Sequence, residues 1–211
     1  MSNAFLSIAA TPAVKAAQEA QGSRRSYARL EGGAPTHDRL GPAEAAFIAA
    51  RDSLYMATVS ETGWPYLQHR GGPPGFLAVL NETTLGMADL RGNRQYITLG
   101  NVAGDDRAAL FLMDYPARRR LKLLARVEVR DIKAEPDLAA RLATPGGAVV
   151  ERAFLFHVEA FDWNCPQHIT PRFTAAEVAV AVAPLQRRLA ELEAENARLR
   201  AQLPPEGRPD P

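Results

Sequence analysis

In the central part of the chain, apolar and polar residues alternate with a period of two. The pattern recurs in six segments: 54–59, 66–69, 84–88, 108–113, 121–129 and 154–161. Gly, Pro, Asn and Asp, which favour turns, separate these segments. In the clearest segment, Leu121 and Leu123 alternate with Lys122 and other charged residues. This alternation predicts strands with one buried face and one face turned to water or to a ligand.

The number and spacing of these segments indicate the fold class. Six short strands with few helices between them favour an antiparallel barrel over a parallel sheet of the Rossmann type. We therefore predict a mainly β protein, a six-stranded antiparallel β-barrel with flanking helices.

Helical spacing appears before the first strand. Residues 12–21 are expected to form a short helix, and 22–40, rich in Gly, Ser, Arg and Pro, an irregular arm. From Pro42 to Arg51, Ala46, Phe47 and Ala50 recur at helical spacing, and Pro42 is acceptable in a first turn. We divide this part of the chain into an N-terminal helix and arm, 1–41, and a barrel domain, 42–183.

The pattern changes again after Pro184. Six residues are spaced alternately by four and three: Leu185, Leu189, Leu192, Asn196, Leu199 and Leu203. This heptad pattern with a single Asn is typical of a parallel two-stranded coiled coil. A helix of this length is marginal by itself, so 184–203 is expected either to pair with a second helix or to fold back on its own domain. Residues 204–211 are expected to be a disordered tail.

Composition narrows the classes of function. With 25 Lys and Arg against 24 Asp and Glu, the chain has no global field that would attract nucleic acid or a membrane surface. We find no apolar run that could span a bilayer and no secretion signal, so a cytoplasmic location is expected. The single cysteine, Cys165, forms a C-x-x-H pair with His168, which supplies two of the four ligands of a structural zinc site. We predict no metal site; Cys165 is either a buried apolar residue or a reactive thiol.

Cationic side chains beside Gly or Pro mark three of the predicted strand ends, 66–76, 88–96 and 114–122. Arg matches two oxygens of a phosphate group at once, and adjacent Gly lets backbone N–H groups approach an anion. Five residues have the required properties: His69, Arg70, Arg91, Asn93 and Arg94. They are either a phosphate site or solvated surface groups.

Five stretches in this order resemble the pyridoxamine 5′-phosphate oxidase-related FMN-binding proteins: ATVSETGWPYLQHRGG, TLGMADLRGNRQY, DDRAALFLMDYPARRRLKLLARVEV, FDWNCPQHITPRFT and the helix before them. The resemblance covers roughly residues 42–174. It implies a split β-barrel that forms a homodimer, with FMN in the groove between the two subunits. A cytoplasmic FMN-dependent oxidoreductase acting on a small molecule is the function it implies.

The resemblance also implies which residues hold the cofactor. For the strand 66–71 and the following segment they are Gln68, His69, Arg70, Gly71, Ala88, Asp89, Arg91, Asn93, Arg94 and Gln95. Arg91 and Arg94 match the phosphate ligands best, with Asn93 at the start of a helix whose N–H groups favour an anion. In the family, a later strand from the second subunit crosses the cofactor, and Arg120 and Lys122 match contacts from that strand. Trp163 and Arg172 match a pair that flanks the flavin ring.

One departure from the true oxidase concerns the substrate. Where the oxidase has an Arg that holds the substrate phosphate, this chain has Gln167, while His168 and Arg172 have counterparts and remain the catalytic candidates. The loss of a charge-assisted contact of about 1.5 to 3 kcal/mol argues against pyridoxamine phosphate as substrate. The alternative to an enzyme is a non-catalytic carrier or sensor of flavin or haem, with a dimerising C-terminal helix.

Overall fold

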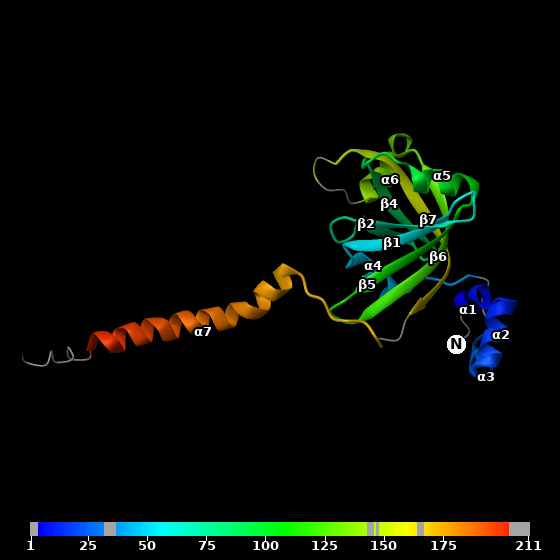
Figure 1. Ribbon diagram of the computed structural model, residues 1–211. Coiled ribbons are helices and arrows are strands. Elements are labelled where there is room, and N and C mark those ends of the chain that lie inside the picture. Colours follow the sequence, from blue (N-terminus) through cyan, green and yellow to red (C-terminus); the bar gives the residue numbers. More distant parts are fainter. Residues whose placement is uncertain (1–3, 32–36, 143–145, 147, 164–166, 203–211) are drawn as a thin grey trace, which may run out of the picture. The chain divides into compact units, whose positions relative to one another are not determined.

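The computed structural model describes residues 4–31, 37–142, 146, 148–163 and 167–202 (Figure 1). The chain divides into two compact units, Met1–Ile169 and Thr170–Pro211. The first contains the sheet and its short helices. The described part of the second contains the long helix α7 (Ala175–Gln202).

A seven-stranded antiparallel sheet is the body of the first unit. Its strands are β1 (Ser53–Val59), β2 (Pro65–Gly71), β3 (Leu77–Asn81), β4 (Thr84–Leu90), β5 (Arg107–Asp114), β6 (Arg119–Arg130) and β7 (Val150–Trp163). They are hydrogen-bonded in the order β2-β1-β5-β6-β7-β4-β3. The two longest strands, β6 and β7, lie at its centre and carry the longest register. The predicted fold class, a mainly β split barrel with flanking helices, is confirmed.

The prediction of six strands was one short, because β3 was missed. β3 pairs with β4 across a short turn, with Leu77 opposite Met87 and Val79 opposite Leu85. Its sequence, LAVLN, is almost continuously apolar, so it lacks the period of two by which the other strands were found. Leu77 is buried and the next three side chains are half-buried, which fits that run.

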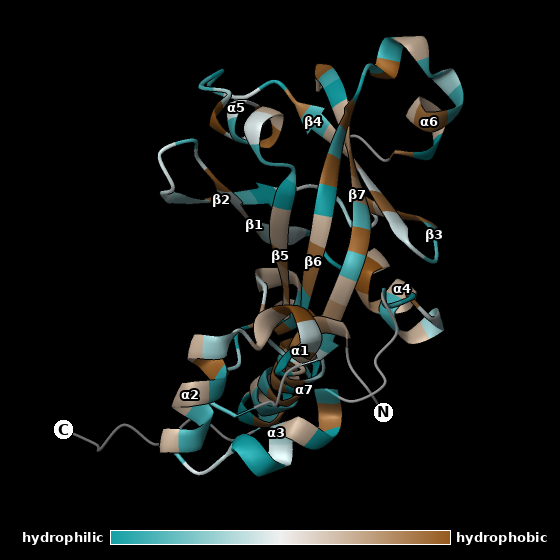
Figure 2. Ribbon diagram, turned by 90° about the vertical axis from the view of Figure 1, so that its right-hand side faces the viewer, coloured by the Kyte–Doolittle hydropathy of each residue, from teal (hydrophilic) through white to brown (hydrophobic). Residues whose placement is uncertain are grey.

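Alternation along the strands separates the core from the surface, as expected for β6. Leu121 and Leu123 are fully buried, whereas the neighbouring Arg120 and Lys122 are half-buried. Hydrophobic and hydrophilic colours alternate along β6 and β7 (Figure 2). Across the sheet, the largest fully buried side chains include Phe154 and Phe156 of β7. A strand of this kind fixes its register, because a slip by one residue would turn its charged side chains into the core.

Short helices flank the sheet: α4 (Pro42–Ala49), α5 (Ile97–Gly104), the 3₁₀ helix η1 (Ile132–Ala134) and α6 (Pro136–Arg141). The predicted helix at 42–51 is confirmed with Pro42 in its first turn, and it ends at Ala49. The expected apolar stripe was partly wrong: Phe47 is buried together with Ile48, while Ala46 and Ala50 are exposed. The larger side chains take the core positions because they bury more apolar area.

Three helices precede the barrel: α1 (Ala4–Ala9), α2 (Pro12–Ala20) and α3 (Arg24–Glu31). The helix predicted at 12–21 corresponds to α2, which is capped by the hydroxyl of Thr11. The prediction of an irregular arm from residue 22 was wrong, because α3 occupies part of it. Glu31 pairs with Lys15 of α2, and Arg24 donates a hydrogen bond to Gln18 of α2, so these contacts hold α3 against α2. A second ion pair, between Arg24 and Glu31, lies within α3. The composition of the segment does not reveal such contacts.

Helix α7 begins earlier than predicted, at Ala175 and not at Pro184. A capping box fixes this start: the Thr174 hydroxyl accepts from the backbone N–H of Glu177, and the Glu177 carboxylate accepts from the backbone N–H of Thr174. Pro184 lies inside the helix. The predicted tail, 204–211, lies outside the described residues, as does Cys165. None of the described helices combines the length and the hydropathy that a membrane crossing needs.

Candidate functional site

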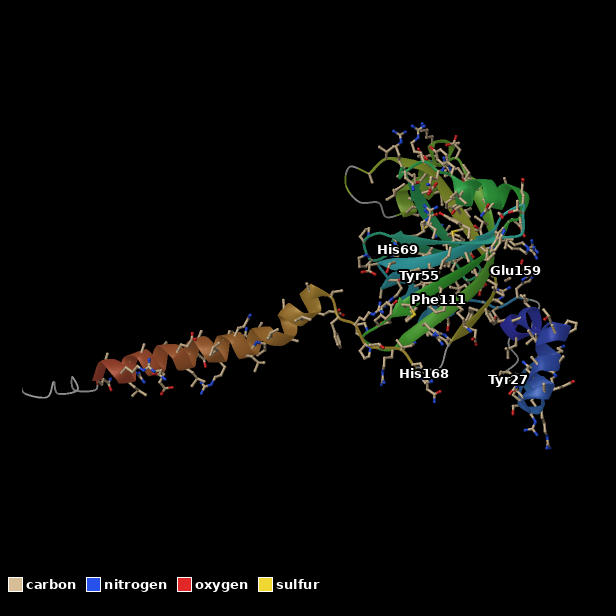
Figure 3. The ribbon with its side chains drawn as sticks, viewed as in Figure 1. Tyr27, Tyr55, His69, Phe111, Glu159 and His168 are labelled. Carbon is tan, nitrogen blue, oxygen red and sulfur yellow. The ribbon has the colours of Figure 1, made fainter. Side chains whose placement is uncertain are left out.

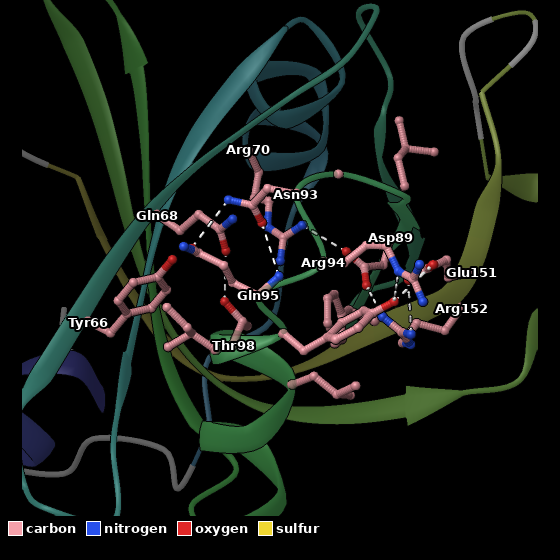
Figure 4. Close-up of a pocket in the computed structure, with 16 residues that line it drawn as sticks. Tyr66, Gln68, Arg70, Asp89, Asn93, Arg94, Gln95, Thr98, Glu151 and Arg152 are labelled. Carbon is pink, nitrogen blue, oxygen red and sulfur yellow. Dashed lines mark hydrogen bonds and ion pairs between the residues drawn. The ribbon is translucent and has the colours of Figure 1, made fainter.

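A cavity of about 230 Å³ lies between β2, β4, the loop 91–96 and the start of β7 (Figure 4). Its lining residues are Tyr66, Gln68, Arg70, Asp89, Leu90, Gly92, Asn93, Arg94, Gln95, Tyr96, Ile97, Thr98, Leu99, Glu151, Arg152 and Phe154. Six of the fourteen residues that the resemblance implied are therefore brought together: Gln68, Arg70, Asp89, Asn93, Arg94 and Gln95.

Strand β2 supplies one wall of the cavity. Because side chains alternate along a strand, Tyr66, Gln68 and Arg70 line the cavity together. The hydroxyl of Thr98, on α5, donates a hydrogen bond of 2.8 Å to Oε1 of Gln68. This bond ties the side-chain carbonyl of Gln68 to α5, so its NH₂ group is the part that remains to donate to a ligand.

An ion-paired triad forms the inner end of the cavity. Arg70 lies 2.7 Å from Oδ1 of Asp89, and Arg152 lies 2.5 Å from its Oδ2. Asp89 is 6% exposed. The Nε atom of Arg70 is buried and has no hydrogen-bond partner within the described part of the chain. Two guanidinium groups thus share one carboxylate, which leaves donor capacity and positive charge on the cavity wall.

The loop between β4 and α5 has an unusual backbone. Arg94 and Tyr96 have φ angles of 62° and 55°, in the left-handed region that non-glycine residues rarely adopt. Strain of this kind is common at binding sites. Within the described part of the chain, Arg94 donates a hydrogen bond of 3.3 Å to the hydroxyl of Tyr96, and it forms no ion pair with a carboxylate there. Its charge is therefore available to an anion in the cavity.

The expectation that Asn93 stands at the start of a helix was wrong. Helix α5 begins at Ile97, after the left-handed Tyr96. Asn93 instead stabilises the loop, because its Oδ1 accepts from the backbone N–H of Gln95 at 3.2 Å. Glycine and proline indicate turns in a sequence. An Arg or a Tyr with a positive φ angle gives no such signal.

Glu151 organises the outer rim of the cavity. It accepts hydrogen bonds from Arg91 and from the hydroxyl of Tyr96, both at 3.2 Å, and lies 3.1 Å from Arg152. Burial raises the pKa of the Glu151 carboxyl, but the hydrogen bonds from Arg91 and Tyr96 and the nearby arginine charges lower it further, to below the ordinary value. Arg91 is exposed, outside the cavity lining, and is occupied with this carboxylate.

Three other implied residues of the first segments lie away from the cavity lining. His69 lies on the opposite face of β2 from Gln68 and packs edge-on against Tyr55 of β1, with ring centroids 5.7 Å apart. Gly71 is the last residue of β2. Ala88 is buried in a small apolar cluster with Ile132.

Two of the later implied residues, Arg120 and Lys122, lie on β6, away from the cavity lining. Arg120 packs over the ring of Phe111, and its buried Nε has no hydrogen-bond partner among the described residues. Lys122 pairs with Asp162 at 2.7 Å. As expected from alternation, both lie on the face of β6 opposite to Leu121 and Leu123.

Trp163 and the catalytic candidates follow at the end of β7 and beyond it. The indole Nε1 of Trp163 donates to Glu44 of α4 at 2.7 Å, and the guanidinium of Arg119 lies 4.6 Å from its ring centroid. His168 has a left-handed backbone with φ of 62° and lies after the last strand. Arg172 belongs to the second compact unit.

The sequence interpretation missed several cavity residues: Tyr66, Tyr96, Thr98, Glu151, Arg152 and Phe154. Arg152 is the most important of them because it shares Asp89 with Arg70. A signal was present, since Glu151 and Arg152 are two charged residues directly before the apolar run 153–156 of β7. Register then places Arg152 directly opposite Asp89 of β4.

The outer face of β1, β2, β5 and β6 is apolar and hollowed. Two shallow cavities of about 440 and 580 Å³ lie on it. Tyr55 is paired with both His69 and Phe111 across the neighbouring strands, so the three side chains share this face (Figure 3). We call outer face the set Tyr55, Ala57, Leu67, Ala109, Phe111 and Leu124, of which Leu67 is 65% exposed. An apolar surface of this kind is typical of a protein interface.

Comparison with known families assigns the barrel. The family model for pyridoxamine 5′-phosphate oxidase matches residues 40–161, more than half of the chain. The chain belongs to this family. The matched range contains the whole cavity lining and the whole outer face.

Comparison with solved structures finds distant similarities. A putative pyridoxamine 5′-phosphate oxidase from Lactobacillus delbrueckii is 21% identical, covers 59% of this chain and 93% of its own, and has a TM-score of 0.45. HupZ of Group A Streptococcus is 13% identical, with coverages of 64% and 99% and a TM-score of 0.45. An FMN-binding protein from Syntrophomonas wolfei is 9% identical, with coverages of 70% and 97% and a TM-score of 0.43. No significant match to a curated protein was found.

Proposed function

We propose that this protein binds FMN and works as a flavin-dependent oxidoreductase, with the phosphate of the cofactor in the cavity beside β2. The observation that carries the proposal is the convergence of Arg70, Arg94 and Arg152 on one cavity of a member of this family. A phosphate monoester needs donors from several directions, and these arginines come from β2, the loop before α5 and β7. The buried Nε of Arg70, which has no hydrogen-bond partner among the described residues, fits an anionic ligand.

The size of the cavity indicates which part of the cofactor it takes. Pockets that enclose a whole drug-sized ligand usually measure about 300 to 1,000 Å³, and this cavity measures about 230 Å³. It fits the phosphate and the adjoining ribityl chain, for which Gln68 and Thr98 supply polar groups. The flavin ring then lies outside this cavity.

We propose that a second copy of the chain completes the site. The apolar outer face supports this, because Leu67 is 65% exposed and the other side chains of the set are only half-buried, so a second copy could bury them further. The family resemblance implies the same arrangement, with the cofactor between two subunits. A two-fold dimer uses each side chain of the interface twice, so a modest face gives a substantial contact.

In this proposal the chain's own residues bind the FMN phosphate and orient the flavin ring. Arg70, Arg94 and Arg152 hold the phosphate, while Asp89 keeps two of these guanidinium groups at a fixed spacing. FMN, when bound, supplies the two-electron redox chemistry. Binding at the phosphate end anchors the ring, so the remaining task of the protein is to orient a small-molecule substrate against it.

The first experiment identifies the ligand. The protein is purified, its ligand is released by heat, and the released compound is identified by mass spectrometry. We expect FMN. Haem or a deazaflavin, or failure to bind added FMN, would contradict the proposed cofactor.

A pair of arginine variants then tests the location of the phosphate. Arg94→Ala should weaken FMN binding about 10- to 100-fold, the effect of one charge-assisted hydrogen bond, and leave riboflavin binding nearly unchanged. Affinities are measured by quenching of flavin fluorescence. The matched control is Arg91→Ala. Arg91 is a neighbouring arginine that lies outside the cavity lining and forms an ion pair with Glu151. Equal losses in the two variants, or equal losses of FMN and riboflavin in Arg94→Ala, would place the phosphate elsewhere.

Catalysis is tested separately from binding. An oxidoreductase should lose its oxidised flavin absorbance when a reduced nicotinamide donor is added without oxygen, and should recover it in air over many cycles. A protein that holds FMN but does not cycle would be a carrier or sensor, and the enzymatic part of the proposal would fail while the cofactor part stands.

A further inference from the structure

A row of apolar side chains lies along helix α7. We call α7 seam the set Leu185, Leu189, Leu192, Asn196 and Leu199, spaced by four, three, four and three residues. Its leucines are 69%, 57%, 44% and 52% exposed. A helix with such a row gains its stability from a second surface that covers the row.

We propose that the α7 seam pairs with the α7 seam of a second copy of this chain, as a parallel, in-register, two-stranded coiled coil. The spacing puts Leu189 and Asn196 at the first core position of their heptads, and Leu185, Leu192 and Leu199 at the fourth. In a parallel pair Asn196 faces Asn196 of the other copy, and each amide can satisfy the other. An antiparallel pair would bury Asn196 against leucine, which leaves its amide unsatisfied.

Charges beside the seam favour a second copy as the occupant. In a parallel coiled coil, the residue directly before a first core position faces a residue of the other helix. That partner has a sequence number larger by five. Arg188 then faces Glu193 of the second copy, and Glu195 faces Arg200. Both pairs are opposite in charge, and all four side chains are exposed on α7. Residues five apart do not face one another within a single helix, so this complementarity acts between helices.

The coil has a consequence for the proposed cofactor site, and this step rests on the proposed function. A parallel in-register coil and a dimer of barrels with the same interface on both copies are both two-fold symmetric. Joining two copies at α7 raises the effective concentration of the barrels toward one another. The α7 seam therefore keeps a site shared between two subunits assembled at low protein concentration.

Site-directed cross-linking of the full-length protein tests the pairing. All variants carry Cys165→Ser, so that the introduced cysteine is the only one. Leu199→Cys places a thiol in the seam, where parallel in-register helices bring equivalent residues within disulfide reach. Ala201→Cys is the matched control, since it lies two residues away on the outer side of the same turn. We expect Leu199→Cys to form a covalent dimer at least 10-fold faster than Ala201→Cys under mild oxidation.

Two outcomes of the cross-linking would overturn the proposal. Equal rates for both variants, including no dimer from either, would mean that the seam does not pair with itself. Cross-linking of Leu199→Cys with Leu185→Cys copies in a mixture, but not with itself, would mean an antiparallel pair.

A charge exchange tests the proposed register. Glu195→Arg should slow cross-linking of Leu199→Cys, and the further change Arg200→Glu should restore it, because the pair is again opposite in charge. Failure of the second change to restore the rate would contradict the parallel register.

The cofactor provides an independent readout. The seam-breaking variant Leu189→Asp/Leu192→Asp should release bound FMN on dilution at higher protein concentrations than the unaltered protein. If FMN does not bind at all while Leu199→Cys cross-links, the coil stands and the proposed function fails. If FMN binds without selective cross-linking, the proposed function stands and the coil fails.

Discussion

The two faces of strand β2 differ in almost every chemical property, although they belong to the same seven residues. The inner face presents Gln68 and Arg70 to a polar cavity with a buried ion-paired triad. The outer face presents Leu67 and His69 beside Tyr55 and Phe111, where the surface is apolar. The comparison teaches that a period of two gives the two sides of one strand opposite chemistry. In the proposed function, adjacent residues of β2 therefore have different roles.

The largest effect is expected on the outer face. Phe111→Glu should convert the proposed dimer of barrels into monomers, because each buried Phe contributes about 1.5 to 3 kcal/mol and a two-fold interface counts it twice. The dimer dissociation constant should rise at least about 100-fold. Sedimentation of the full chain in the Leu189→Asp/Leu192→Asp background measures this without the contribution of α7.

The control for this variant is Val149→Glu. Val149 is 51% exposed and lines neither hollow of the outer face, so its substitution should leave the dissociation constant unchanged. If Phe111→Glu remains as dimeric as Val149→Glu, the outer face is not the interface, and the comparison of the two faces of β2 loses its functional meaning.

The next effect is expected on the inner face. Asp89→Ala should lower the free energy of unfolding by about 3 kcal/mol, because it leaves two largely buried guanidinium groups without their shared carboxylate. Inorganic phosphate should recover part of this loss by taking the place of the carboxylate between Arg70 and Arg152. Thermal unfolding with and without phosphate measures both effects.

The matched control for Asp89→Ala is Glu82→Ala. Glu82 pairs with Arg39, and the two side chains are 56% and 68% exposed, so this change should cost less than about 1 kcal/mol and show no recovery by phosphate. Equal destabilisation in the two variants would mean that the triad contributes no more than a surface pair. A phosphate effect of the same size in both would mean that phosphate acts on the protein in general.

Strand positions and the family motif could be read from the sequence, because both follow from local patterns. Leu121 and Leu123 alternate with charged residues, and β6 has that period of two. The Arg-Gly-Asn-Arg run likewise marks a loop at the cavity. Arg152 could not be found in this way, since its role depends on register with Asp89 across the sheet. The left-handed Tyr96 and the place of His69 on the outer side of β2 also depend on the folded chain.

The smallest effect is expected in the helices that flank the outer face, where Phe5 and Ile8 of α1 line its two hollows. Hydrogen bonds from Arg24, together with Lys15, lower the pKa of the Glu31 carboxyl to about 2. A carboxyl with a lowered pKa in the folded state stabilises above the pKa of the unfolded chain, and this stabilisation is lost as the pH falls through the folded value. The protection of α3 amides against hydrogen exchange should therefore decrease between about pH 4.5 and pH 2, relative to that of β6.

Glu31→Gln should remove this pH dependence and lower the protection of α3 at neutral pH, whereas Glu19→Gln on α2 should retain the dependence. If α3 exchanges with the same pH profile in the unaltered protein and in Glu31→Gln, the ion pairs of Glu31 do not stabilise α3.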